Sequence, residues 1–507
     1  MSTLYPDRRT RALIKVATCM ATVMQVMNIS LVNIALPHMQ AELGATPDEI
    51  SWALTSYLIA TAIFIPTTGY LADRFGSRQV LIWGSIVFTA ISVLCGLSTH
   101  LGEFVFLRLL QGIAGAPLVP VAQLVMIENH PPEEQTRALA YWSTASMVVP
   151  VFGPTVGAWL TDALNWRWCF HLCVPLGVLT VLLTAHAVPQ ARTRRRPMDW
   201  TGFGFMMLAV GGLQYALDRG NRVDWFDAGE IRIAVLLAAA GFAAFVLHSR
   251  RSRVRPIFSL TLLRDRNLLA ASVMMSVFAI TLFGTMVVQP MLLVTLLHYP
   301  PMTAGVLMAV RAICTAATML AAPNIMAGLG IRGTLITGTA LVSAGTWGMA
   351  SMSLDVDAVG FALPTVLHGL GLGMLFLPAT TIAFVTLAAE QRSDASGLYN
   401  LFRSLGQSLG ISLNVMLLTR MTQTSWNQLS GHVDRFNPAL GAYAGQLGLR
   451  PDDPATLGVV AAELGRQATM VAMLDVFVFL TWFGLVTLPL VLLIRAETGK
   501  PAPARGG

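Results

Sequence analysis

The feature that most constrains the fold of this chain is a series of long apolar segments, each able to cross a lipid bilayer. A membrane-spanning helix needs about 20 mostly apolar residues, because the hydrocarbon core is about 30 Å thick. Fourteen segments of the 507 residues meet this requirement: 13–36, 49–72, 79–98, 103–127, 137–161, 168–187, 200–217, 230–248, 268–295, 302–323, 332–353, 358–380, 393–418 and 470–495. Only 12% of the residues are charged, against roughly 25% in soluble domains. We therefore predict an all-helical integral membrane protein.

The positive charges indicate how this protein lies in the membrane. If the N-terminus is cytoplasmic, 22 of the 33 Lys and Arg residues fall on the cytoplasmic side, where such residues are enriched. An even number of spans places both termini there. The formal net charge of +7 is then explained by topology, and no basic surface helix suggests nucleic-acid binding. The first apolar run is too long for a signal peptide and is interpreted as a retained span.

The linkers divide the chain into parts. Two basic segments, near 188–199 and 249–267, bracket a pair of spans. We predict an N-terminal six-helix bundle over 1–187, two inserted helices with their linkers over 188–267, and a second six-helix bundle over 268–495. Residues 496–507 form a cytoplasmic tail. Residues 419–469 are polar and are predicted to be a long outer loop, with a short helix leading into the last span.

The run GYLADRFGSR connects the second and third spans. Gly69 and Gly76 allow close packing, and Asp73 can cap a helix end or pair with Arg74 or Arg78. A charged cluster at a cytoplasmic helix end can act as a conformational latch that forms in one state and breaks in another. A plain positively charged loop is the alternative.

Two further spans carry unusual residues. Arg108 and Gln111 lie within the fourth span, where a charge costs at least about 2.5–3.5 kcal/mol and is a functional candidate; the alternative is that Arg108 reaches the outer interface. In the fifth span Gly153 and Gly157 form a face of small residues, and Pro154 can kink the helix. This helix could seal one half of the protein against the other.

These three motifs, in this order, resemble the major facilitator superfamily. The segments MQVMNISLVNIALP, WALTSYLIATAIFIPTTGYLADRFG, WRWCFHLCVPLG, LDRGNRVDWF and SGLYNLFRSLGQSLG narrow the resemblance to the fourteen-helix drug:proton antiporters of EmrB/QacA type, over about residues 12–495. The resemblance implies two six-helix bundles around a central cavity and two inserted central helices. It also implies a bacterial inner-membrane pump that exchanges protons for amphipathic toxic compounds by alternating access. A periplasmic adaptor and an outer-membrane channel would be its partners, and the proton gradient would replace any cofactor.

The sequence departs from this family in its acidic residues. Asn28 stands where the family usually has an aspartate in the first span, and an amide cannot titrate. Asp475 is the acid that lies clearly within a predicted span, about five residues from the outer end of its helix. We predict Asp475 as the proton-coupling site, with a structural ion pair as the alternative. His368 is a second candidate, or else a hydrogen-bonded packing residue.

Arginines outnumber acids inside the predicted spans. Arg311 and Arg403 lie near mid-span and could pair with Asp475, line the cavity or bind an anionic group. With Arg108 they make three cations against one acid, which favours neutral or anionic amphipaths as substrates. A dedicated exporter of one endogenous metabolite, or a facilitator with weakened proton coupling, remain alternatives. The nine histidines form no chelating pair on one helix face, so an enzyme is not expected.

Overall fold

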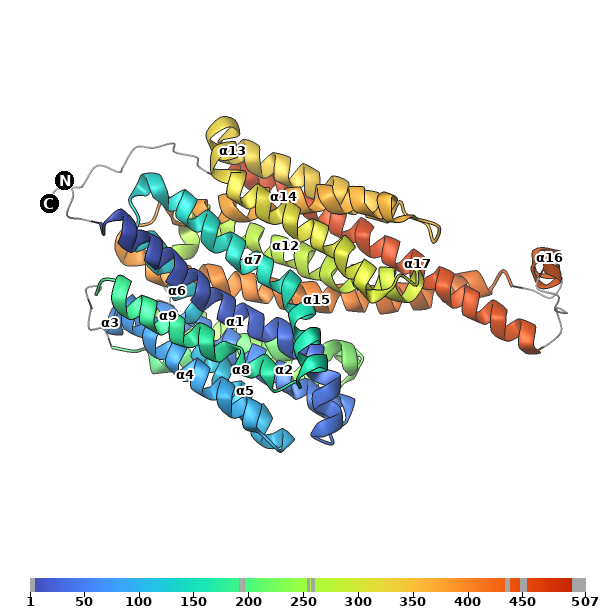
Figure 1. The fold of residues 1–507 in the computed structure, drawn as a ribbon, viewed down its shortest axis with the longest axis horizontal. Helices are drawn as coiled ribbons and strands as arrows, with labels where there is room; N and C mark the ends of the chain where they lie inside the picture. The colour runs from blue at the N-terminus through green and yellow to red at the C-terminus, as the bar shows by residue number, and fades with distance from the viewer. Residues whose placement is uncertain are drawn as a thin grey trace.

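The computed structural model describes residues 5–190, 193, 197–252, 256, 260–433, 438–446 and 454–494. All regular secondary structure in this part of the chain is helical (Figure 1). Each predicted span is helical over most of its length, and four of them, 49–72, 103–127, 168–187 and 470–495, are divided between consecutive α-helices. The prediction of an all-helical membrane fold is confirmed. The basic clusters Arg192, Arg194–Arg196, Arg253 and Arg255 and the tail 496–507 lie outside the described residues, and the predicted division of the chain at 187 and 267 stays a prediction.

The first group of helices precedes the two basic linkers, and we call it the N-terminal group. It consists of α1 (Arg8–Glu42), α2 (Pro47–Phe64), α3 (Thr68–Phe75), α4 (Ser77–Leu97), α5 (Leu101–Gly115), α6 (Leu118–Glu128), α7 (Pro132–Ala163), α8 (Trp168–His171) and α9 (Cys173–Ala187). Local chemistry sets several of the boundaries. Thr46 and Glu49 form a capping box at the start of α2. Gly76 separates α3 from α4 at a φ of 85°, a conformation that favours glycine.

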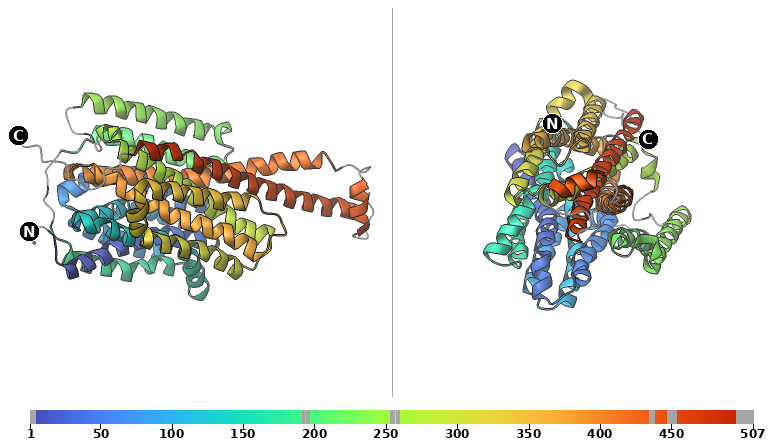
Figure 2. Two further views of the ribbon diagram at one scale, coloured as in Figure 1. Left: turned by 90° about the horizontal axis from the view of Figure 1, so that it is seen from above. Right: turned by 90° about the vertical axis from the view of Figure 1, so that its right-hand side faces the viewer.

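The middle pair consists of α10 (Trp200–Arg219) and α11 (Gly229–Arg251), joined by the short turns η2 (Gly220–Arg222) and η3 (Trp225–Asp227). These helices lie at the side of the molecule, as Figure 2 shows. His248 Nε2 near the end of α11 lies 2.8 Å from Asp199 Oδ1 at the start of α10. The α10 helix packs against α2 and also against α15, so the pair borders both larger groups.

The C-terminal group follows the second linker. It consists of α12 (Arg266–Met291), α13 (Pro301–Ala350), α14 (Ala358–Val385), α15 (Arg392–Ser430), α16 (Pro438–Gln446), α17 (Pro454–Leu485) and α18 (Leu488–Leu493). The long α13 is kinked at Gly330, where φ is 70°, and so contains two predicted spans. Ten helices of the described chain are long and apolar enough to span a bilayer. That number counts α13 once and omits α7, α10 and α15, which are long but more polar.

Residues 419–469 differ from the prediction. The α15 helix continues to Ser430 and α17 begins at Pro454, so much of the predicted outer loop is helical. The two helices pack together and extend beyond the rest of the molecule, with α16 at the tip, which we call the outer arm (Figure 1). Gly465 of α17 faces the ring of Trp426 of α15. Polar composition suggested a loop, but two helices that extend beyond the other helices bury only the side chains that face each other, so polar residues fit them well.

Candidate functional site

The Gly69–Arg78 motif contacts the C-terminal group. The Ser393 hydroxyl at the start of α15 donates to Asp73 Oδ1 at 2.9 Å. A side chain at Gly69 would lie 2.8 Å from the backbone Cα of Asp394, so glycine is required for this approach of α3 to α15. Arg78 donates instead to the Ala185 carbonyl of α9. The predicted latch residues therefore bridge two parts of the molecule, and their role as a latch stays a prediction.

A second set of contacts lies next to this motif, between α6 and α15. Ser396 donates to the Pro120 carbonyl at 2.9 Å, and Asn400 Nδ2 donates to Gln123 Oε1 at 2.8 Å. All four residues are buried. Sequence reasoning missed Gln123 and Asn400, because an amide in an apolar segment has no feature that distinguishes an inter-group contact from local packing.

Arg108 is the centre of a buried network inside the N-terminal group. Its Nε donates to the Ala53 carbonyl at 2.9 Å, and its Nη1 donates to Asn28 Oδ1 at 2.6 Å and to Gln111 Oε1 at 2.5 Å. The guanidinium also lies over the Tyr57 ring, 4.3 Å from its centroid. Arg108 is fully buried, which excludes the alternative that it reaches the outer interface. Its Nη2 has no hydrogen-bond partner, and no acid pairs with it among the described residues.

Arg311 forms a similar arrangement in the C-terminal group. Its Nη1 donates to Thr285 Oγ1 at 3.0 Å and to Gln289 Oε1 at 2.7 Å, while its Nη2 has no partner. His368 of α14 is near enough to interact with it electrostatically. Both ring nitrogens of His368 are buried without a hydrogen bond in the described structure, so it is not the hydrogen-bonded packing residue considered above.

The structure does not bring Asp475 to the arginines. Asp475 is exposed on the surface of α17, and no ion pair joins it to Arg311 or Arg403 in the described part of the chain. It is the twenty-second residue of α17 rather than about the fifth, because that helix begins at Pro454. Arg403 lies near Tyr399 and its Nε has no partner. Among the described residues, neither Asp475 nor Arg403 forms an ion pair with another predicted site residue.

The small residues of α7 pack within the N-terminal group. A side chain at Gly153 would lie 2.6 Å from Ser30 Cβ, and one at Gly157 would lie 3.3 Å from Leu31 Cα, so both glycines face α1. The α7 helix also contacts α13 and α14 of the other group. Its helical backbone continues through residue 154, and the side chain of Pro154 is outside the description.

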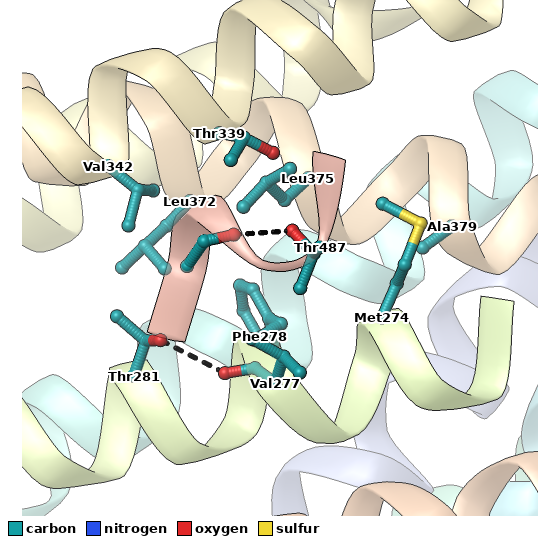
Figure 3. Close-up of a pocket in the computed structure, with 11 residues that line it drawn as sticks. Met274, Val277, Phe278, Thr281, Thr339, Val342, Leu372, Leu375, Ala379 and Thr487 are labelled. Atoms are coloured by element: carbon teal, nitrogen blue, oxygen red, sulfur yellow. Dashed lines mark hydrogen bonds between the residues drawn. The ribbon is translucent and has the colours of Figure 1, made fainter. Parts of the chain in front are cut away.

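A small pocket lies inside the C-terminal group, between α12, α13, α14 and the end of α17 (Figure 3). Apolar residues and threonines form its wall: Met274, Val277, Phe278, Thr281, Thr339, Val342, Leu372, Leu375, Ala379, Gly484 and Thr487. It contains none of the buried arginines. The pocket is therefore separate from the charged networks that the sequence analysis singled out.

Asp218 is an acid that sequence reasoning missed. The predicted seventh span ended at residue 217, but α10 continues to Arg219 and includes Asp218. One of its carboxyl oxygens is buried and has no hydrogen-bond partner. Asp218 is therefore an acid at the end of a helix that corresponds to a predicted span, in addition to Asp475. Since the residue lies at a helix end, an error of two residues in the boundary was enough to hide it.

Known proteins resemble this chain over nearly its full length. Residues 18–411 match the Major Facilitator Superfamily. The multidrug export protein EmrB of Escherichia coli K12 is 32% identical, over 93% of this chain and 94% of that protein. The fatty acid resistance protein FarB of Neisseria gonorrhoeae is 29% identical, over 97% and 98%. Among solved structures, the proton:xylose symporter XylE has a TM-score of 0.59 at 14% identity, covering 94% of this chain and 96% of that one.

The comparisons and the helical architecture agree. A family match across most of the chain, several apolar helices and a shared fold with membrane transporters all indicate a multi-pass membrane transporter rather than an enzyme. The chain belongs to the major facilitator superfamily, and within it to the EmrB-type transporters.

Proposed function

We propose that this chain exports amphipathic toxic compounds, neutral or anionic, in exchange for protons. The observation that carries the substrate preference is that Arg108 and Arg311 are each buried, each with a free Nη2 and without an acidic partner among the described residues. A buried cation without a counter-charge is costly and is stabilised by an anionic group. A site for lipophilic cations would instead contain acids.

The relatives support this class of substrate. The E. coli relative is called a multidrug export protein, and the gonococcal relative is called a fatty acid resistance protein. A fatty acid is an amphipathic anion. We infer that this chain handles molecules of the same general kind, and that a dedicated exporter of one endogenous metabolite is the second candidate.

Alternating access is the proposed mechanism. The contacts of α15 with α3 and α6 join the two larger groups through Asp73, Gln123 and their partners at the inner side of the predicted topology. Such contacts can break when the groups rock apart, which would open the inner side to substrate. The proposed latch residues would then regulate which side is open.

Exchange for protons requires a side chain that binds and releases a proton. Asp475 and His368 are the candidates named from the sequence, and Asn28 makes a facilitator with weakened coupling the alternative. We further propose an inner-membrane location with cytoplasmic termini, and a periplasmic adaptor and outer-membrane channel as partners. The outer arm formed by α15, α16 and α17 supports an external partner, because it offers a surface outside the predicted spans.

Transport into proteoliposomes under an imposed pH gradient tests this function. Two amphipathic probes of permanent charge, radiolabelled taurocholate and ethidium, separate charge preference from passive weak-acid redistribution. We expect gradient-driven transport of taurocholate at a rate at least several times that of ethidium. Equal rates would overturn the proposed charge preference, and transport unaffected by the gradient would favour the facilitator. Full gradient-driven transport by Asp475→Asn would remove that residue from coupling.

A further inference from the structure

The α10 helix is bonded to both larger groups at its outer end. Toward the C-terminal group, Gln214 Nε2 donates to Ser408 Oγ at 2.6 Å, and the Ser412 hydroxyl donates to the Leu217 carbonyl at 2.7 Å. These bonds attach the helix to α15. They are short, and both serines are buried.

Aromatic contacts attach the same end of α10 to the N-terminal group. The rings of Tyr215 and Trp52 of α2 lie 6.0 Å apart, and the Arg219 guanidinium lies 5.4 Å from the centroid of the Trp52 ring. The α10 helix therefore occupies a junction between α2 and α15. These two helices belong to the groups whose relative movement the proposed function requires.

Asp218 lies at this junction. Thr55 of α2 and Gln214 of α10 are the hydrogen-bonding side chains beside its carboxyl group. Nevertheless, Oδ2 of Asp218 and Oε1 of Gln214 are both buried acceptors without a donor. Gln214 and Asp218 lie four residues apart in α10, on one face of the helix. Acceptors on such residues can be satisfied together by one proton, since a protonated carboxyl group donates a hydrogen bond.

The charged groups around Asp218 leave it without an ion pair in the described structure. Arg222 of η2 is a cation that interacts electrostatically with Asp218, and its Nη1 lies 3.9 Å from Asp48 of α2. Arg219 lies 3.8 Å from Glu230 of α11. The α15 helix contributes the hydroxyl groups of Ser408 and Ser412 to this junction. Among the described residues, the ion pairs of these two arginines are with Glu230 and Asp48, and neither arginine forms one with Asp218.

We propose that Asp218 is a proton-binding site that controls how α10 holds α2 and α15 together. The proposal rests on the proton-coupled function above and names a site for it outside the residues picked from the sequence. A proton from the outer solution binds Oδ2 and forms an O–H bond that donates to Gln214 Oε1. The amide nitrogen of Gln214 then donates to Ser408, as in the structure.

The ionised form requires the opposite arrangement. A carboxylate accepts only, so the Gln214 amide turns by 180° and directs its NH₂ group to Asp218. Its oxygen then accepts from the Ser408 hydroxyl. The proton on Asp218 therefore determines whether Ser408 of α15 accepts or donates, which is how a charge change on the inserted helix reaches the C-terminal group.

Spin labels on the outer ends of the two groups test this site. Thr99→Cys and Thr419→Cys, in a background without the five native cysteines, report the distance across the outer side in full-length protein in lipid nanodiscs. In the parent protein, the ratio of long to short distances should change with pH between 5.5 and 8.5, by up to tenfold per pH unit for one proton. Asp218→Asn, which mimics the protonated form, should reduce the change to less than about twofold.

Two variants keep the result interpretable. Asp227→Asn removes an exposed acid from η3, beyond the same end of α10, and should titrate like the parent. Asp218→Glu retains a carboxyl group and should titrate with a shifted midpoint, which shows that the fold tolerates a substitution at this position. Titration of Asp218→Asn with the parent amplitude would overturn this inference. Absence of gradient-driven transport in the parent proteoliposomes would instead overturn the proposed coupling, so the two failures are distinguishable.

Discussion

Replacing Gly69 by alanine should weaken the contact between α3 and α15. The added Cβ would lie 2.8 Å from the Cα and 2.9 Å from the backbone nitrogen of Asp394. Real Cβ atoms essentially never approach other heavy atoms below 3.0 Å. Because the obstacle is backbone rather than a flexible side chain, the two helices must move apart.

The energetic cost of this substitution can be placed within a range. Overpacking a well-packed site costs roughly 1–3 kcal/mol. The cost applies only while α3 and α15 are in contact, so it lowers the population of the contacted state against the separated one. Since 1.4 kcal/mol corresponds to a factor of ten, the equilibrium should move by roughly fivefold to about 100-fold toward separation.

Electron–electron double resonance measures this shift. Spin labels at the exposed positions Phe75 and Ala388, near the two sides of the contact, should show a longer-distance population that grows in Gly69→Ala. Gly102→Ala is a matched control, because a Cβ there would meet nothing within 4 Å. If Gly69→Ala and Gly102→Ala give the same distance distribution, the steric reasoning is refuted.

Three further predictions concern single side chains. Arg108→Leu removes the hydrogen-bond donor of the buried oxygens of Asn28 and Gln111. The free energy of unfolding should fall by roughly 1–3 kcal/mol for each acceptor left without a donor, and an unchanged melting temperature would contradict this. Asn28→Asp places a carboxylate beside Arg108, and because a bound anion disfavours a neighbouring carboxylate, we expect more protons to be taken up when taurocholate binds the detergent-solubilised protein, measured with a pH dye; uptake equal to that of the parent would contradict it. Burial lowers the pKa of His130, between α6 and α7, below its ordinary 6.5. The unfolded chain then binds that proton more readily, so stability should fall as pH drops below 6.5, and melting curves of His130→Gln should lack this component.

The helical architecture was predictable because apolar segments must satisfy their backbone hydrogen bonds internally in lipid. The outer arm is too polar to give this signal, which is why its helices were predicted to be a loop. The burial of Arg108 could be anticipated from the cost of a charge in a span, and Gln111 lies three residues along the same helix, within reach of its side chain. The other two partners could not be anticipated, because Asn28 comes from α1 and the Ala53 carbonyl from α2, and their approach depends on tertiary packing.

The acids were the hardest residues to predict. Asp475 had the right type and an apolar surrounding sequence, yet hydropathy does not determine which way a side chain faces, and it is exposed on α17. Asp218 lies at a helix end next to Arg219, where the mean hydropathy of the sequence falls and the predicted span ends. Its buried environment comes from α2 and α15, which are distant in the sequence.

The unbroken length of α15 has a mechanical consequence. One helix of 39 residues, about 58 Å long at 1.5 Å per residue, touches Asp73 near its first turn and enters the outer arm at its last. A stiff rod held at one end behaves as a lever, so a small tilt at the inner contact becomes a larger displacement at the arm. A partner that binds the outer arm would therefore also restrain the contact between α15 and Asp73.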